Sequence, residues 1–331
     1  MPKVINAECL QAMAEMADNS VDAIITDPPY FKVKNEAWDQ QWDKPNQFIA
    51  WIGKLCEEWQ RILKPNGSLY VFASPKMSAR VEVEIGRWFN VLNCARWTKA
   101  AGWHNKTVPE DLRSFLSPWE SIIFAEHFSA DNMAKGEAGY VAKCDELRGF
   151  VFEPLRAYLD GERDRAGWTT RRVAEEYQKK TGSRTVTGMA GHWFGAVQWA
   201  LPTEENYNWL RALFNASDGD YLRREYDYLR REYEDLRRPF SVTADVPYTD
   251  VWDFKTVAHY PGKHPCEKPA ALMEHIVSAS TRPGAVVLDC FMGTGSTGIA
   301  CQKLGREFIG IEMSPEYCTT ASKRLAVKHL F

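Results

Sequence analysis

Short runs of aliphatic and β-branched residues alternate with helical stretches at both ends of this chain, and this alternation limits the possible folds most. Residues 21–26 and 68–73 are two such runs, separated by a stretch with helical spacing at 48–63, and the pattern returns at 286–289 and 308–312. Strands that alternate with helices mostly pair in parallel, and helices cover both faces of the sheet. The sequence therefore predicts an α/β fold, a doubly wound mixed sheet.

Turn-forming residues and a change in the hydrophobic pattern divide the chain into parts. A Lys-Pro-Asn-Gly stretch at 64–67 predicts a turn before the strand at 68–73, and two more strand candidates, 91–98 and 121–125, are joined by a polar loop too long for a tight hairpin. From about 140 to 248 the alternation disappears, which indicates an inserted, mainly helical module. We expect a first core half at 1–139, the insert at 140–248 and a second core half at 249–331.

The composition excludes several classes of protein. The 331 residues carry a formal net charge of −3, so any surface for nucleic acid must come from local basic segments. The eight cysteines stand singly, so we expect neither a metal site nor a disulfide framework. No apolar run approaches the roughly 20 residues of a membrane span, so we expect a cytoplasmic protein without membrane contact.

A glycine-rich turn, Asp-Cys-Phe-Met-Gly-Thr-Gly at 289–295, follows one predicted strand and leads into a helix that we expect to begin near Ser296. Glu312 ends the next strand about 20 positions later, where an acid can accept hydrogen bonds from two ribose hydroxyls. A tight glycine turn lets the backbone approach a ligand closely. Each feature alone also fits a structural turn or a helix cap. Together they indicate an adenosyl-type ligand.

The Asp-Pro-Pro-Tyr turn at 27–30 suits one chemistry in particular. The exocyclic amine of a nucleobase is a poor nucleophile, because its lone pair is delocalised into the ring. The Asp27 carboxylate and the Pro28 carbonyl can each accept one N–H, which directs the lone pair at an electrophilic methyl group. Pro28 and Pro29 stiffen the backbone, and Tyr30 can stack on the base. Alone, such a turn is most often structural, so its context decides the interpretation.

The turn at 27–30 ahead of the glycine turn at 289–295 resembles the β-group amino-methyltransferases of DNA, over roughly residues 4–126 and 250–326. The resemblance implies a circularly permuted, Rossmann-like class I methyltransferase whose inserted module recognises the target. It also implies S-adenosylmethionine as cofactor, double-stranded DNA with a flipped-out base as substrate, and a homodimer. Such enzymes are bacterial or phage-encoded and act at the nucleoid, alone or beside a restriction endonuclease. Because Asp27 and not Ser heads the turn, adenine N6 is the implied target.

The resemblance also implies roles for particular residues. Asp27, Pro28, Pro29 and Tyr30 would be catalytic, and Phe31 would help Tyr30 to receive the base. Glu8 stands where the family usually has an Asp that contacts the cofactor adenine, and the segment 264–269 is similar to the family's contact with the methionine end. The implied cofactor-binding residues are Glu8, His264, Lys268, Asp289, Phe291, Gly293, Thr294, Gly295, Ser296 and Glu312. Trp38 and Trp42 either close over the pocket or are ordinary loop aromatics.

Basic and aromatic residues interleave in the insert around a turn at 181–182, which favours a helix-turn-helix-like DNA reader, although a plain helical domain fits nearly as well. A near repeat at 221–238 has an apolar seam of Leu222, Tyr226, Leu229, Tyr233 and Leu236, which predicts an amphipathic or coiled-coil-like helix. The candidate DNA contacts are Arg171, Arg172, Lys179, Lys180 and Arg184.

Three kinds of protein remain compatible with these motifs. The first is a DNA amino-methyltransferase, acting on adenine N6 or on cytosine N4. The second is an RNA guanine-N2 or protein-amide methyltransferase that uses the same turn chemistry, and the third is a nonenzymatic DNA-binding protein. The glycine turn follows the Pro-Pro turn by about 260 residues, an order that favours the first kind. The recognition sequence stays open.

Overall fold

The computed structural model describes residues 2–99, 108–127, 153–185, 188–195, 199–242, 248–258, 260 and 263–327. It forms two compact units, Met1–His127 with Pro239–Phe331, and Phe128–Arg238. The second unit ends before the expected bound of 248, because the chain after Arg238 packs on the first. The Ser241 amide donates to the Ala279 carbonyl (2.8 Å), and the Phe240 ring stacks on Phe124 (5.7 Å).

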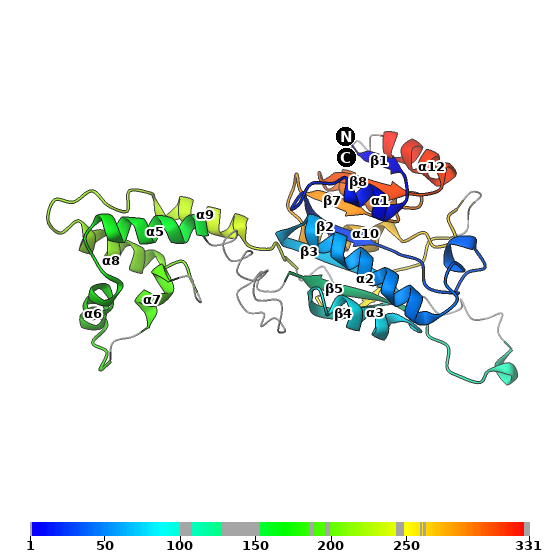
Figure 1. Cartoon of the computed structure of the whole chain (residues 1–331), viewed down its shortest axis with the longest axis horizontal. Coiled ribbons are helices and arrows are strands. Elements are labelled where there is room, and N and C mark those ends of the chain that lie inside the picture. The colour runs from blue at the N-terminus through cyan, green and yellow to red at the C-terminus, as the bar shows by residue number, and fades with distance from the viewer. Residues whose placement is uncertain are drawn as a thin grey trace. The chain divides into compact units, whose positions relative to one another are not determined.

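A single eight-stranded sheet, in the order β1-β8-β7-β2-β3-β5-β4-β6, forms the first unit (Figure 1). Its pairs are parallel except β3 with β5 and β4 with β5. The predicted α/β fold with a mixed sheet is thus confirmed. The strands are β1 (Lys3–Asn6), β2 (Val21–Thr26), β3 (Leu63–Ala73), β4 (Asn90–Thr98), β5 (Trp119–Glu126), β6 (Val251–Asp253), β7 (Val286–Asp289) and β8 (Glu307–Glu312).

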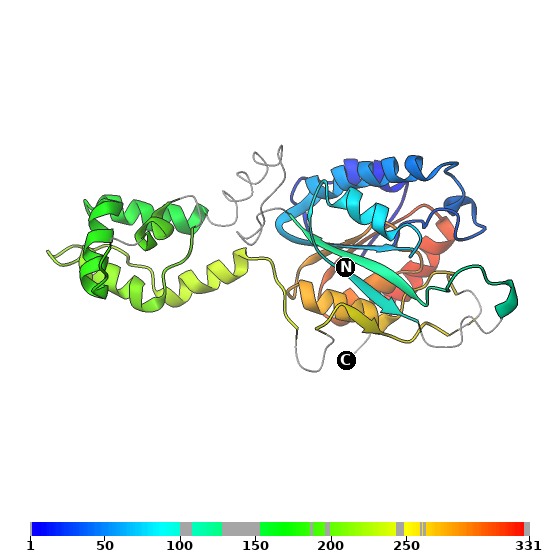
Figure 2. The ribbon, with the colours of Figure 1, turned by 90° about the horizontal axis from the view of Figure 1, so that it is seen from below.

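Helices cover both faces of the sheet (Figure 2). One face packs on α1 (Cys9–Ala14), α2 (Pro45–Ile62) and α3 (Ser78–Ile85), and the other on α10 (Ala270–Ser280), α11 (Ser296–Lys303) and α12 (Pro315–Ala326). Alternate residues of a strand point to opposite faces, so Ile24 joins the first core and Ile25 the second. Two short 3₁₀ helices, η1 (Ala37–Asp39) and η2 (Pro109–Asp111), lie in loops.

The predicted turn at 64–67 does not separate α2 from the strand, because these residues already belong to β3. β3 begins at Leu63, directly after α2. Leu63 pairs with Val21 and Ser68 with Ala23, so the four residues between them oppose Asp22 alone and form a bulge. A bulge accommodates Pro65, which cannot donate to the ladder. An ion pair from Lys64 Nζ to Asp22 Oδ1 (2.8 Å) fixes the bulge to β2.

The second unit is a helical domain with its own core. It contains α5 (Glu153–Arg165), α6 (Thr170–Thr181), α7 (Met189–Phe194), α8 (Glu204–Phe214) and α9 (Tyr226–Leu236). Leu159, Trp193 and Tyr207 are among its fully buried side chains. Gly182, with φ of 66°, ends α6 and confirms the expected turn. No helix within the described ranges has both the length and the apolar character to cross a bilayer.

The repeat at 221–238 is not one helix, so that prediction was wrong. α9 begins at Tyr226, so the second copy is helical, whereas the first copy is non-helical up to Glu225. The backbone of the first copy is bound by other helices. The Leu222 amide donates to Glu162 Oε2 (2.6 Å), and its carbonyl accepts from Arg211 Nε (2.8 Å). Leu222 itself is fully buried with φ of 53°, a conformation that ends helical propagation.

Candidate active site

A cavity of about 270 Å³ opens at the carboxyl ends of β2, β7 and β8. These strands are parallel neighbours, so the residues that follow them meet at one edge of the sheet, as open α/β sheets place their ligands. Among the residues that line the cavity are thirteen named from the sequence: Glu8, Asp27, Pro28, Pro29, Tyr30, His264, Lys268, Asp289, Phe291, Gly293, Thr294, Ser296 and Glu312. The structure therefore brings the two predicted motifs to one place.

Three aromatic or glycine candidates lie elsewhere. Phe31 packs on Phe48 of α2, with ring centroids 5.8 Å apart, and Trp42 is buried in the same core. Gly295, at φ of 84°, is the N-cap of α11, where a side chain would meet Ala321 Cβ at 3.3 Å. Trp38, by contrast, does line the cavity, together with Lys34, which the sequence did not single out.

Asp289 links the glycine turn to the end of β2. Its Oδ1 accepts hydrogen bonds from Thr26 Oγ1 (3.2 Å) and the Phe291 amide (3.1 Å), and its Oδ2 accepts one from Thr297 Oγ1 (2.6 Å). Burial, with 5% of the residue exposed, raises the pKa of Asp289 to about 7. Thr26 immediately precedes Asp27, so this bond fixes the end of β2 beside the turn.

Glu312 holds the glycine turn from the neighbouring strand. Its Oε2 accepts a hydrogen bond from the Gly293 amide (3.1 Å), and its Oε1 accepts one from the Ser314 amide (2.8 Å). Burial raises the pKa of Glu312. Gly293 has φ of 50°, a left-handed conformation that favours glycine. Each carboxylate oxygen keeps a further acceptor lone pair, and Glu312 lines the cavity.

The segment before α10 closes another side of the cavity. His264 lies edge-on to Tyr317 of α12, with ring centroids 4.5 Å apart, and burial with the nearby Lys268 charge lowers the pKa of His264 to about 4. Arg324 of α12 donates to the Thr294 hydroxyl (2.8 Å) and pairs with Glu267 (3.1 Å). Arg324 thereby joins this segment to the glycine turn, a role that no sequence signal indicated.

Glu8 is the N-cap of α1. Its Oε2 accepts a hydrogen bond from the Gln11 amide (2.9 Å), and its Oε1 accepts one from Cys9 Sγ (3.1 Å). Partial burial acts to raise its pKa, but the amide donors at the helix terminus outweigh burial and lower it. Glu8 therefore caps α1 and lines the cavity at the same time.

Asp39 holds the loop that follows the Asp-Pro-Pro-Tyr turn, and the sequence did not identify it. Its fully buried carboxylate accepts hydrogen bonds from the amides of Tyr30 (2.7 Å), Val33 (2.6 Å) and Lys34 (2.6 Å). The two intervening residues, Phe31 and Lys32, have φ of 62° and 58°. Side chains disfavour this region, so Asp39 compensates for backbone strain beside the site.

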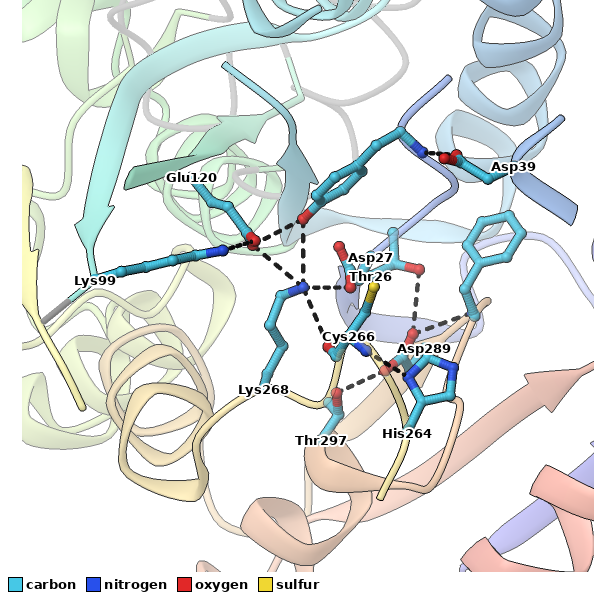
Figure 3. A network of polar contacts seen from close by, with 12 residues as sticks. Thr26, Asp27, Asp39, Lys99, Glu120, His264, Cys266, Lys268, Asp289 and Thr297 are labelled. Atoms are coloured by element: carbon cyan, nitrogen blue, oxygen red, sulfur yellow. Dashed lines mark hydrogen bonds and ion pairs between the residues drawn. The ribbon is translucent and has the colours of Figure 1, made fainter. Parts of the chain in front are cut away.

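The two oxygens of Asp27 have different surroundings (Figure 3). Oδ2 accepts a hydrogen bond from Lys268 Nζ, whereas the buried Oδ1 has no hydrogen-bond partner among the described residues. Burial raises the pKa of Asp27, and the Lys268 charge opposes that rise. A buried carboxylate oxygen without a donor is costly, so this atom is available to a ligand N–H from the cavity.

Lys268 joins Asp27 to a cluster that sequence reasoning missed. Its side chain is only 7% exposed, and Nζ lies 3.3 Å from both the Tyr30 hydroxyl and Glu120 Oε2. Tyr30 donates to Glu120 Oε2 (3.0 Å), and Lys99 donates to Glu120 Oε1 (2.5 Å). Lys268 was expected at the cofactor, and the structure places its Nζ at the Asp27 carboxylate. Glu120 directly precedes the predicted strand at 121–125, and only this position could have drawn attention to it.

The basic residues expected to contact DNA are exposed on or just after α6 in the second unit. Most have neighbours of opposite charge or an aromatic ring. Arg171 pairs with Glu175 (3.0 Å), Lys179 with Glu176 (2.7 Å), Lys180 with Glu205 (2.9 Å), and Arg172 lies over Trp168 (4.5 Å to the centroid), while Arg184 is exposed near the end of α6. The acids dilute the positive field of this surface.

Known proteins resemble this chain along nearly its whole length. The type II methyltransferase M.HpaI of Haemophilus parainfluenzae is 24% identical over 327 residues, covering 98% of this chain and 74% of the relative. The DNA adenine methyltransferase YhdJ of Escherichia coli K12 is 25% identical over 332 residues, covering 98% and 82%.

Solved structures share the fold. The M1.HpyAVI–SAM complex aligns with a TM-score of 0.52 at 21% identity, covering 99% of this chain and 100% of that chain. The PvuII DNA methyltransferase, described as cytosine-N4-specific, aligns with a TM-score of 0.56 at 12% identity, covering 99% and 87%. The N6_N4_Mtase family model, described as DNA methylase, matches residues 21–323, and the chain therefore belongs to this DNA methylase family.

Proposed function

We propose that this DNA methylase transfers a methyl group from S-adenosylmethionine to N6 of a flipped-out adenine in double-stranded DNA. The observation that carries the proposal is the free Oδ1 of Asp27, buried at the cavity that the glycine turn also lines. The family is S-adenosylmethionine-dependent. YhdJ, named as an adenine methyltransferase, supports adenine as the target base.

The cavity residues fit the proposed cofactor, which supplies an electrophilic methyl group. Glu312 would accept hydrogen bonds from the ribose hydroxyls, and the left-handed Gly293 leaves the turn open to close approach. Asp289, His264 and the turn from Phe291 to Ser296 would hold the methionine end. Glu8 would contact the adenine from the N-terminus of α1, where its carboxylate already accepts a hydrogen bond from the Gln11 amide.

The catalytic turn would orient the target amine. Asp27 Oδ1 and the Pro28 carbonyl would each accept one N–H, so that the nitrogen lone pair points at the methyl group. Tyr30 is fixed at both ends, by Asp39 at its amide and by Glu120 at its hydroxyl, and its ring would stack on the extruded base. Attack on a methyl group requires orientation more than a strong base.

Mass spectrometry tests the chemistry and the target together. Purified protein is incubated with unmethylated DNA and S-adenosylmethionine, and the DNA is digested to nucleosides. We expect N6-methyladenine. The likeness in fold to the cytosine-N4-specific PvuII enzyme favours a second candidate, and N4-methylcytosine would keep the mechanism and replace the target. If protein that binds the cofactor produces no methylated base in the DNA, the proposed function is refuted.

For the second unit, 128–238, we propose target recognition, with the exposed cations of α6 at the DNA backbone. Charge reversal at Arg171 and Arg172 should weaken DNA binding and leave cofactor affinity unchanged. The family resemblance further supports a homodimer in the cytoplasm, acting alone or with a restriction endonuclease. Sedimentation at micromolar concentration that shows only monomer, with and without DNA, would refute the dimer.

A further inference from the structure

Glu120, the second residue of β5, belongs to the polar cluster beside Asp27, between Lys99 and Lys268 (Figure 3). Its Oε2 accepts the Tyr30 hydroxyl (3.0 Å) and lies 3.3 Å from Lys268 Nζ. Its Oε1 accepts Lys99 Nζ (2.5 Å), which anchors Glu120 from the end of β4. One carboxylate therefore holds two cations and the tyrosine of the catalytic turn.

We propose that Glu120 is a positioning residue for methyl transfer, which holds Lys268 and Tyr30 so that Asp27 presents Oδ1 to the target amine. The inference rests on the proposed function. A nearly buried ammonium needs anionic partners. Lys268 has two such partners, Asp27 and Glu120. Because Glu120 compensates part of the ammonium charge, Lys268 binds one oxygen of Asp27 without neutralising the whole carboxylate.

Glu120 also acts through its charge. The attacking nitrogen becomes positive as it bonds to the methyl group, so Lys268 opposes the reaction and a nearby anion favours it. Burial raises the pKa of Asp27, Lys268 lowers that pKa, and Glu120 raises it. Loss of the Glu120 charge should therefore lower the pKa of Asp27 and make its carboxylate a weaker acceptor.

Other ionisable groups also face Asp27, and each remains in the chain with its own charge when Glu120 is changed. These groups are Lys268 and Cys266 before α10, Tyr30 after β2 and Asp289 at the end of β7. Only Lys268 among them is a cation. Loss of the Glu120 charge therefore leaves the Lys268 ammonium beside Asp27 less compensated, and it also releases Lys99.

Glu120→Gln tests the proposal, because glutamine keeps the shape and one acceptor oxygen but removes the charge. Single-turnover methylation is measured across the pH range, and cofactor affinity by calorimetry. We expect the rate to fall about 10- to 100-fold, with cofactor affinity changed less than about twofold, and the acidic limb of the rate profile to move to lower pH. Glu57→Gln, an exposed change of the same kind on α2, should alter neither quantity.

Lys268→Met should shift the pH–rate profile in the opposite direction, and it tests the proposal if Glu120→Gln unfolds. Without the cation, the pKa of Asp27 should rise, so the acidic limb should move to higher pH. An unmoved limb in both variants overturns the proposal, as does an unchanged rate in folded Glu120→Gln. A failure of the proposed function is distinguishable, since the unmodified protein would then methylate no DNA base at all.

Discussion

Asp39→Asn should release the loop that follows the catalytic turn. In the native loop the Asp39 carboxylate accepts three amide hydrogen bonds, from Tyr30, Val33 and Lys34. Bonds to a charged group contribute about 1.5–3 kcal/mol each, whereas each of the two non-glycine residues at φ of 62° and 58° costs about 1–2 kcal/mol. The charged bonds outweigh the strain, and the loop stays closed.

Asparagine offers one acceptor oxygen and turns an N–H₂ group toward the remaining amide. It keeps at most two bonds, now neutral and contributing about 1 kcal/mol each, which only balances the strain. On these figures loop closure should weaken by about 2.5–7 kcal/mol, and the open population should rise about 70-fold or more.

Limited trypsin digestion measures that population, because cleavage after Lys32 and Lys34 requires an open loop. Asp43→Asn is the matched control, an exposed change of the same chemistry in the same region. Cleavage of Asp39→Asn within about twofold of the Asp43→Asn rate would refute the reasoning.

Three further predictions concern the cavity. Asp27→Ala should lower single-turnover methylation by about 10³-fold or more and spare cofactor affinity; affinity lost in parallel, by calorimetry, would contradict the catalytic role. Glu312→Ala should weaken S-adenosylmethionine binding by about tenfold or more, since it removes the ribose acceptor and the bond to Gly293; an unchanged dissociation constant would exclude the ribose role. The pKa of Asp289 is about 7 when folded, against about 4 unfolded, so the folded state binds the extra proton between these values. The free energy of unfolding should therefore lose a contribution as pH rises from about 4 to 7, and Asp289→Asn should lack it; identical pH dependence in urea titrations of both proteins would count against this.

The sequence predicted the parts of the fold that depend on local pattern. Runs of aliphatic residues located β2 and β7 with the bounds that they have in the structure, because a strand buried on both faces is apolar at consecutive positions. Each motif lies directly after such a strand, so its position at the sheet edge followed from the strand itself. The repeat at 221–238 shows the limit of local pattern, since the seam predicted one helix and contacts from α5 and α8 decided otherwise.

The amino-acid sequence by itself determined the α/β core, the two motifs and most of the predicted residues that meet at the cavity, because these depend on local periodicity and on residues adjacent to strand ends. Tertiary structure alone decided the partners of the catalytic turn. Glu120 and Lys268 are far apart in the chain from Asp27, and Asp39 acts through backbone amides that any residue could supply. Partial compensation of a buried charge depends on distances between side chains, and no linear pattern encodes those distances.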